Sequence, residues 1–84
     1  MVTLFTLQKC IFCDKLKAKL NEAEIEFKEF NIDYDKNKLV FEKLVNLTQS
    51  ENVPTIIVGK QILAPNKSFN TIDEAFEIIQ KLLA

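Results

Sequence analysis

Residues 2–16 read VTLFTLQKCIFCDKL, and this stretch decides the fold. Residues 2–7 are almost all apolar and rich in β-branched and aromatic side chains, which is typical of a strand buried on both faces. Over residues 11–23 the pattern changes, because the apolar side chains recur at helical spacing. Cys10 and Cys13, the only two cysteines of the chain, lie where the predicted strand gives way to the predicted helix.

The next segments predict a βαβ unit and a further helix. Residues 26–32 are strand-like, and together with the first strand and helix they predict two parallel strands joined by a right-handed crossover. A second helix is predicted over about residues 36–47, with Asp33 or Asp35 as its N-cap. Its apolar face would consist of Val40, Phe41, Leu44, Val45 and Leu47.

The C-terminal half predicts a hairpin and a last helix. The segments TIIV (55–58) and QIL (61–63) flank Gly59 and Lys60, which predict a hairpin turn. Thr71 and Glu74 have the spacing of a capping box, so the last helix should begin there. The predicted fold class is therefore α/β with the order βαβαββα, a mixed four-stranded sheet flanked by three helices.

Composition narrows the class of protein. The chain has 84 residues, of which 48% are hydrophobic, and this predicts a single domain over residues 1–84. All 11 basic residues are Lys and the net charge is −1, whereas nucleic-acid-binding proteins usually have a positive excess and Arg. The sequence contains no run of about 18 apolar residues, so it predicts no membrane span. Residues 1–8 lack the features of a signal peptide, so we expect a cytoplasmic location. We also expect the protein to be a monomer.

The two cysteines allow three interpretations. A metal site usually needs four N or S ligands, and two Cys without any His supply half of one. Two unreactive core cysteines are the second interpretation. A dithiol–disulfide exchange pair is the third, and the position of Cys10 and Cys13 favours it. Free N–H groups and the positive end of the helix dipole stabilise a thiolate at a helix start, and Lys9 would add positive charge.

Three features together resemble the glutaredoxin family, which has the thioredoxin fold. They are the segment CIFCDKLKAKL at residues 10–20, the dipeptide Val53-Pro54 before the third strand, and the order of the elements. The resemblance extends from residue 2 to the last helix. Phe12 has the place of the aromatic residue that precedes the second cysteine in dithiol glutaredoxins. The resemblance implies a thiol–disulfide oxidoreductase in which Cys10 is the nucleophile and Cys13 the resolving thiol.

The resemblance also implies a glutathione site. Pro54 would follow a cis peptide bond and lie against the two sulfurs, and the backbone of Val53 would pair with an extended substrate. Asn70 and Thr71, at the start of the last helix, would bind the γ-glutamyl end. Gln49 would donate a hydrogen bond to the glycyl carboxylate. The aromatic side chains expected near this cleft are Phe12 and Phe69.

The chain departs from the family pattern at four places. Ile11 replaces the usual Pro between the cysteines, and Leu7 replaces a Lys, which leaves Lys9 as the neighbouring base. Glu51 lies where a basic residue is common before Val-Pro, and Lys67-Ser68 lies where the family has Gly-Gly. The last two departures concern the glutathione site rather than the thiol chemistry.

Two classes of function follow. The first is a small dithiol glutaredoxin that reduces protein disulfides or glutathione mixed disulfides, with no bound cofactor and with glutathione as reductant. A variant of it is a redoxin recharged by thioredoxin reductase that serves a partner such as ribonucleotide reductase. The second class is a non-catalytic thioredoxin-fold binding module that presents the edge at Val53-Pro54 to a partner or shares a metal between two chains.

Overall fold

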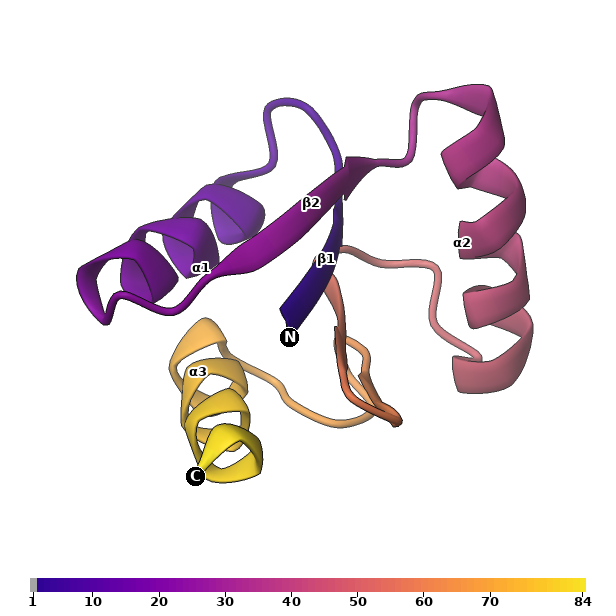
Figure 1. Cartoon of the computed structure of the whole chain (residues 1–84). Helices are drawn as coiled ribbons and strands as arrows, with labels where there is room; N and C mark the ends of the chain where they lie inside the picture. The colour runs from indigo at the N-terminus through magenta and orange to yellow at the C-terminus, as the bar shows by residue number, and fades with distance from the viewer. Residues whose placement is uncertain (1) are drawn as a thin grey trace.

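A computed structural model, which describes residues 2–84, gives the architecture of the chain. Two helices, α1 and α3, lie on one side of the sheet, and α2 lies on the other (Figure 1). The elements are β1 (Val2–Thr6), α1 (Ile11–Glu22), β2 (Phe27–Asn31), α2 (Asp35–Thr48), β3 (Thr55–Val58), β4 (Gln61–Leu63) and α3 (Ile72–Leu83). The predicted βαβαββα order is confirmed.

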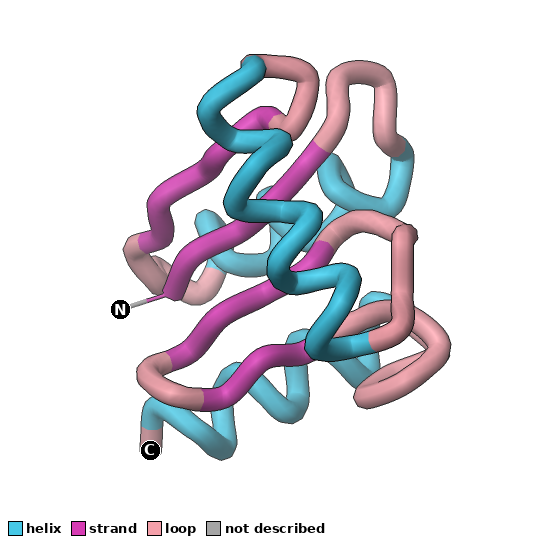
Figure 2. The backbone as a smooth tube through the Cα atoms, turned by 90° about the vertical axis from the view of Figure 1, so that its right-hand side faces the viewer, coloured by secondary structure: helices cyan, strands magenta, loops and turns pink. Residues whose placement is uncertain are grey.

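The sheet is mixed, as predicted, and its strands lie in the order β2-β1-β3-β4. The central strand β1 pairs in parallel with β2 and antiparallel with β3, while β3 and β4 form the antiparallel hairpin. Figure 2 shows α2 crossing this sheet. Gly59, with φ of +60°, begins the two-residue turn between β3 and β4, where its missing side chain removes the usual steric penalty. The central position of β1 explains why its sequence is apolar on both faces.

The larger part of the core lies between the sheet and the pair α1 and α3. Val2 and Leu4 of β1 point to this side, because alternate strand residues face opposite ways. They pack with Leu16 and Leu20 of α1 and with Ile79 of α3, and all five side chains are fully buried. This packing fixes the start of α1, and hence the two cysteines, relative to the sheet.

A smaller core lies under α2. Phe5 of β1 packs there with Phe41 and Leu44, and the broad apolar face predicted for this helix is narrower than expected. Val40 and Leu47 were expected on that face, but their side chains are 46% and 72% exposed. The reason is angular: Phe41, Leu44 and Val45 form one stripe, and positions 40 and 47 turn away from it.

The predicted N-cap of α2 is wrong. Neither Asp33 nor Asp35 caps the helix, because its N-cap is Tyr34 and Asp35 already lies in the first turn. The turn before it is organised by Asn31, whose Oδ1 accepts the N–H of Asp33 at 2.8 Å. Asn37 Nδ2 donates to the Asn31 carbonyl at 2.9 Å. The helix therefore begins at Asp35, one residue before the predicted start, and no acidic side chain caps it. No helix within residues 2–84 is both long and apolar enough to span a membrane.

Candidate active site

Cys10 and Cys13 are joined by a disulfide bond at the start of α1. Cys10 is the N-cap of the helix, and its Sγ accepts the backbone N–H of Cys13 at 3.1 Å. Lys9, with φ of 59°, turns the chain from the end of β1 into this cap. Cys13 is fully buried, whereas Cys10 is half-buried. Cys10 is therefore the more exposed residue of the two.

The two residues between the cysteines are strongly exposed apolar side chains. Ile11 is 79% exposed and Phe12 is 63% exposed. Neither contributes to the packing of α1, which relies on Leu16 and Leu20. Exposed apolar side chains of this kind are available for contact with another molecule.

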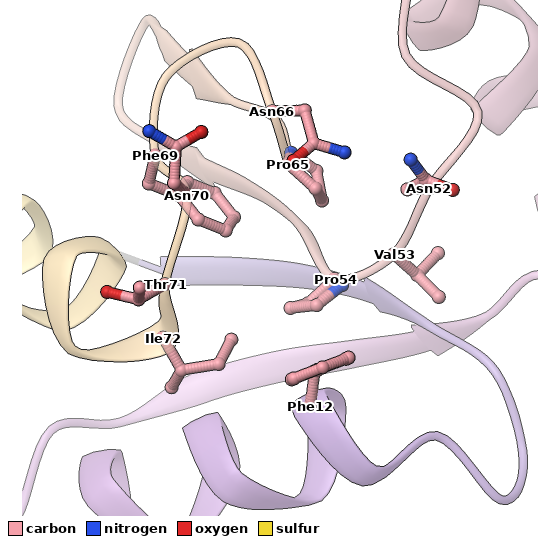
Figure 3. A pocket seen from close by; sticks show the side chains of 10 residues that line it. All are labelled: Phe12, Asn52, Val53, Pro54, Pro65, Asn66, Phe69, Asn70, Thr71 and Ile72. Carbon is pink, nitrogen blue, oxygen red and sulfur yellow. The ribbon is translucent and has the colours of Figure 1, made fainter.

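A groove of about 310 Å³ has Phe12, the residue before Cys13, at one wall, and neither cysteine lines it. Figure 3 shows Pro54 between Phe12 on one side and Pro65 on the other. The peptide bond between Val53 and Pro54 is cis, as the family resemblance implies. The groove is lined by Phe12, Asn52, Val53, Pro54, Pro65, Asn66, Phe69, Asn70, Thr71 and Ile72, and none of these side chains is charged.

Side chains, rather than strand pairing, hold the segment before Pro54. Ser50, which is buried, donates its hydroxyl to the carbonyl of Pro65 at 3.1 Å, and its Oγ accepts the N–H of Asn52 at 3.4 Å. Thr55 Oγ1 donates to the Asn52 carbonyl at 3.0 Å. No backbone hydrogen bond within residues 2–84 involves Val53. Val53 itself is one of the residues that line the groove.

The start of α3 forms the other end of the groove and carries the predicted capping box. Thr71 Oγ1 accepts the N–H of Glu74 at 3.1 Å. In return, Glu74 Oε1 accepts the N–H of Thr71 and the N–H of Asn70, both at 3.1 Å. Two backbone donors of the groove are thus bonded to a carboxylate of the same chain.

Ion pairs tie α1 to its neighbours. Lys17 Nζ lies 2.8 Å from Glu29 Oε2 on β2, and the buried hydroxyl of Thr6 donates to the same oxygen at 2.7 Å. The hydrogen bond from Lys17 lowers the pKa of Glu29 below its usual value and raises the pKa of Lys17. Lys19 Nζ lies 2.8 Å from Asp73 Oδ1 and so links α1 to the first turn of α3. Polar contacts thus link α1 both to β2 and to the first turn of α3.

The family model for Glutaredoxin matches residues 2–63, well over half of the chain. This chain belongs to the glutaredoxin family. No curated protein matches the sequence at a significant level. In the part of this glutaredoxin that the structure describes, no group of three or more His, Cys, Asp or Glu side chains is placed to hold a metal ion.

Several solved structures share the fold of this glutaredoxin at low sequence identity. The buckwheat glutaredoxin–glutathione complex has a TM-score of 0.77 at 15% identity, covering 98% of this chain and 74% of that one. The holo form of glutaredoxin C1 from Populus tremula x tremuloides has a TM-score of 0.72 at 20% identity, covering 95% and 74%. The Archaeoglobus fulgidus glutaredoxin has a TM-score of 0.70 at 21% identity, covering 98% and 84%. The chain therefore has the thioredoxin-like fold, as expected.

The structure brings several of the site residues that the sequence singles out together at one groove, but the two cysteines, Lys9 and Gln49 do not line it. Lys9 is exposed in the turn before the disulfide, and Gln49 lines a second, more open groove, where its Nε2 donates to the carbonyl of Asn46 at 2.9 Å. The residues that meet at the first groove are Phe12, Val53, Pro54, Phe69, Asn70 and Thr71.

Four lining residues of this glutaredoxin were not predicted from the sequence: Asn52, Pro65, Asn66 and Ile72. Asn66 has a φ of 64°, and the cluster of Pro, Asn and Ser within residues 65–68 is a sequence signal for a loop. The signal does not say what the loop faces. The groove-side contacts of Glu74 were also missed, because a capping box predicts a helix start and not a neighbouring cleft.

Proposed function

We propose that this glutaredoxin is a dithiol thiol–disulfide oxidoreductase. The observation that carries the proposal is the Cys10–Cys13 disulfide, with the more exposed cysteine at the N-cap of α1 and the buried one a helical turn further in. The more exposed cysteine at a helix N-terminus suits a nucleophile, because the N–H groups and the dipole stabilise its thiolate. A buried second cysteine suits a resolving thiol.

In the proposed cycle the reduced Cys10 thiolate attacks one sulfur of a substrate disulfide. That S–S bond breaks, the other substrate sulfur leaves and takes a proton, and Cys10 is left in a mixed disulfide. The Cys13 thiol then loses its proton and attacks Cys10 Sγ, which closes the Cys10–Cys13 disulfide and releases the second substrate thiol. Two electrons pass from the dithiol to the substrate. The disulfide form is the oxidised end of this cycle.

Reduction closes the cycle, and we assign it to glutathione. One glutathione thiolate attacks Cys10 and releases the Cys13 thiolate, which takes a proton. A second glutathione attacks the mixed disulfide, so glutathione disulfide forms and Cys10 leaves as the thiolate. Support comes from the family and from the groove, whose free Val53 backbone can pair with an extended peptide. Within this proposal Phe12, Pro54, Asn70 and Thr71 contact the substrate.

A second candidate is favoured by the exposure of Ile11 and Phe12. These side chains form apolar surface around the disulfide, which suits a protein partner better than a small polar thiol. Under this candidate the protein is a redoxin recharged by thioredoxin reductase, and it passes electrons to a protein such as ribonucleotide reductase.

One pair of coupled assays separates the candidates. The first supplies glutathione, glutathione reductase and a glutathione mixed disulfide, and the second supplies thioredoxin reductase and a protein disulfide. We expect turnover in the first assay. Turnover in the second assay alone would transfer the reductant role to the reductase. No turnover in either, with the Cys10–Cys13 disulfide still reducible by dithiothreitol, would leave a non-catalytic binding module.

A further inference from the structure

We propose that Ile11 selects the substrate disulfide by the side chains beside its cysteine. The favoured substrate class is a protein disulfide whose cysteine is flanked by apolar residues, one of which packs against Ile11. The inference rests on the proposed function, because it takes Cys10 as the attacking sulfur. It concerns the disulfide that is reduced and is independent of the reductant that closes the cycle.

The Ile11 side chain has no part in holding the fold together. It is 79% exposed and belongs to neither of the two hydrophobic clusters that form the core. Single exposed apolar side chains are common on protein surfaces, but the next residue, Phe12, is strongly exposed as well. Two such neighbours in the first turn of α1 form an apolar surface that the packing of the helix does not require.

The position of Ile11 places this surface beside the proposed nucleophile. Ile11 is the first residue of α1 and directly follows Cys10, the N-cap. Because the Cα–Cβ bonds of a helix tilt toward its N-terminus, the Ile11 side chain leans toward the end that Cys10 caps. In the mixed disulfide a substrate sulfur is bonded to Cys10 Sγ at about 2.0 Å. The residues on either side of the substrate cysteine are thereby brought close to Ile11.

Ile11 and the groove are separate contact surfaces. Phe12 lines the groove, whereas Ile11 lines neither this groove nor the adjoining one. A ligand confined to the groove therefore leaves Ile11 exposed, and a substrate has to extend beyond the groove to cover it. A polypeptide continues on both sides of its cysteine and extends in this way, so the proposed class is a protein disulfide.

The charges near Cys10 favour uncharged neighbours of the substrate cysteine. Lys9 is the only charged residue within residues 7–13, and no ion pair in the part of the chain that the structure describes includes it. The first acid after the cysteines, Asp14, lies 3.5 Å from Lys17 Nζ. A basic residue beside the substrate cysteine would be repelled by Lys9, whereas an apolar residue would meet Ile11.

The experiment compares two peptide disulfides as substrates of the reduced protein. Each is the homodisulfide of a short peptide with blocked termini and one cysteine, flanked by leucines in one peptide and by serines in the other. One turnover converts the peptide disulfide into two thiols and the protein dithiol into the Cys10–Cys13 disulfide. Each second-order rate constant is divided by that of dithiothreitol with the same peptide, which removes the intrinsic difference between the peptides. The preference is the ratio of the two normalised values, leucine peptide over serine peptide.

The preference is measured in the wild type and in three variants. Ile11→Ser removes the apolar side chain, and Ile11→Leu retains one of similar size. Leu47→Ser is the matched control, because Leu47 is 72% exposed and lies on α2, across the sheet from α1 (Figure 1). Far-UV circular dichroism of each variant reports whether the helices are retained.

We expect the wild type to prefer the leucine peptide about three- to tenfold, which corresponds to partial burial of one apolar side chain. Ile11→Ser should bring the preference to within about twofold of one, because that burial is lost. Ile11→Leu and Leu47→Ser should retain the preference of the wild type. A preference that persists in Ile11→Ser, or that Leu47→Ser lowers by as much, would overturn the role of Ile11.

The wild type alone separates the two levels of the argument. If it reduces neither peptide while dithiothreitol reduces both, the proposed function fails. If it reduces both peptides at the same normalised rate, the proposed function holds and only the role of Ile11 fails.

Discussion

The N-termini of α1 and α3 border the same groove but are capped in different ways. At α1 the cap is sulfur, because Cys10 Sγ accepts the N–H of Cys13. At α3 the cap is a hydroxyl and a carboxylate, because Thr71 and Glu74 exchange hydrogen bonds. Phe12, in the first turn of α1, and Thr71, at the cap of α3, both line the space between them.

The difference separates chemistry from stability. The capping atom of α1 is the atom proposed to react, so the favourable field of that helix end acts on a negative charge that appears and disappears with the redox state. The capping groups of α3, the Thr71 hydroxyl and the Glu74 carboxylate, have no part in the proposed reaction and stabilise the start of the helix. A helix N-terminus is thus capped by the sulfur proposed to react at α1, and by the side chains of Thr71 and Glu74 at α3.

The largest effect should come from removing the sulfur cap. Serine is a good N-cap, so Cys10→Ser should retain α1 while abolishing turnover completely. An assay with a glutathione mixed disulfide measures the loss of turnover, and far-UV circular dichroism measures whether α1 is retained. Cys13→Ser is the control, and it should keep the monothiol step with the mixed disulfide. Residual dithiol turnover in Cys10→Ser, or loss of the monothiol step in Cys13→Ser, would reverse the roles assigned to the two sulfurs.

The hydroxyl cap that Thr71 gives α3 should contribute to the stability of the fold. Thr71→Ala removes the acceptor of the Glu74 N–H and should lower the free energy of unfolding by about 1 kcal/mol, within a usual range of about 0.5–2. Urea unfolding of the oxidised protein measures this. Thr71→Ser retains the hydroxyl and should stay close to the wild type. A loss in Thr71→Ser equal to that in Thr71→Ala would show that the methyl group, and not the cap, stabilises α3.

The stability of the fold should depend on pH through Glu29 on β2, whose carboxylate accepts a hydrogen bond from Lys17 on α1. The pKa of Glu29 is lowered in the folded protein, so near that pKa the unfolded state binds more protons and stability rises with pH. The contribution is present above about pH 4.3, the usual pKa of Glu, and is lost as the pH falls through the folded pKa. Because the carboxylate is partly exposed, its size is at most about 1 kcal/mol. Urea unfolding between pH 7 and pH 3 should give a shallower pH dependence for Glu29→Gln, and parallel curves would contradict the assignment.

The smallest effect should come from the ion pair that joins the two helices. Lys19 and Asp73 are only partly covered, and exposed pairs contribute little. Asp73→Asn should therefore leave the midpoint of urea unfolding almost unchanged at physiological salt. Any loss seen at low salt should shrink as salt is added. A large, salt-independent loss would mean that this pair, rather than the shared apolar core, positions α3 against α1.

The helices and strands were predictable because each follows from neighbours in the chain. The hydrophobic period places α1, and the capping box places the start of α3 at Thr71. The N-cap of α2 was not predictable from acidic residues alone, since the side chain and carbonyl of Asn31 organise the turn before it. The exposed sides of that helix were likewise misjudged, because an apolar run does not say how wide a stripe the sheet covers.

The sequence by itself determined the order of the elements, the cysteine pair at a helix start and the family. These rest on periodicity, spacing and caps, which are properties of short segments. Only the tertiary structure decided which distant residues form the groove with Phe12, namely Asn52, Pro65 and Asn66. It also decided that Glu74 faces the backbone donors of that groove. Such contacts depend on how the helices and loops pack on the sheet, and no local pattern in the chain specifies that packing.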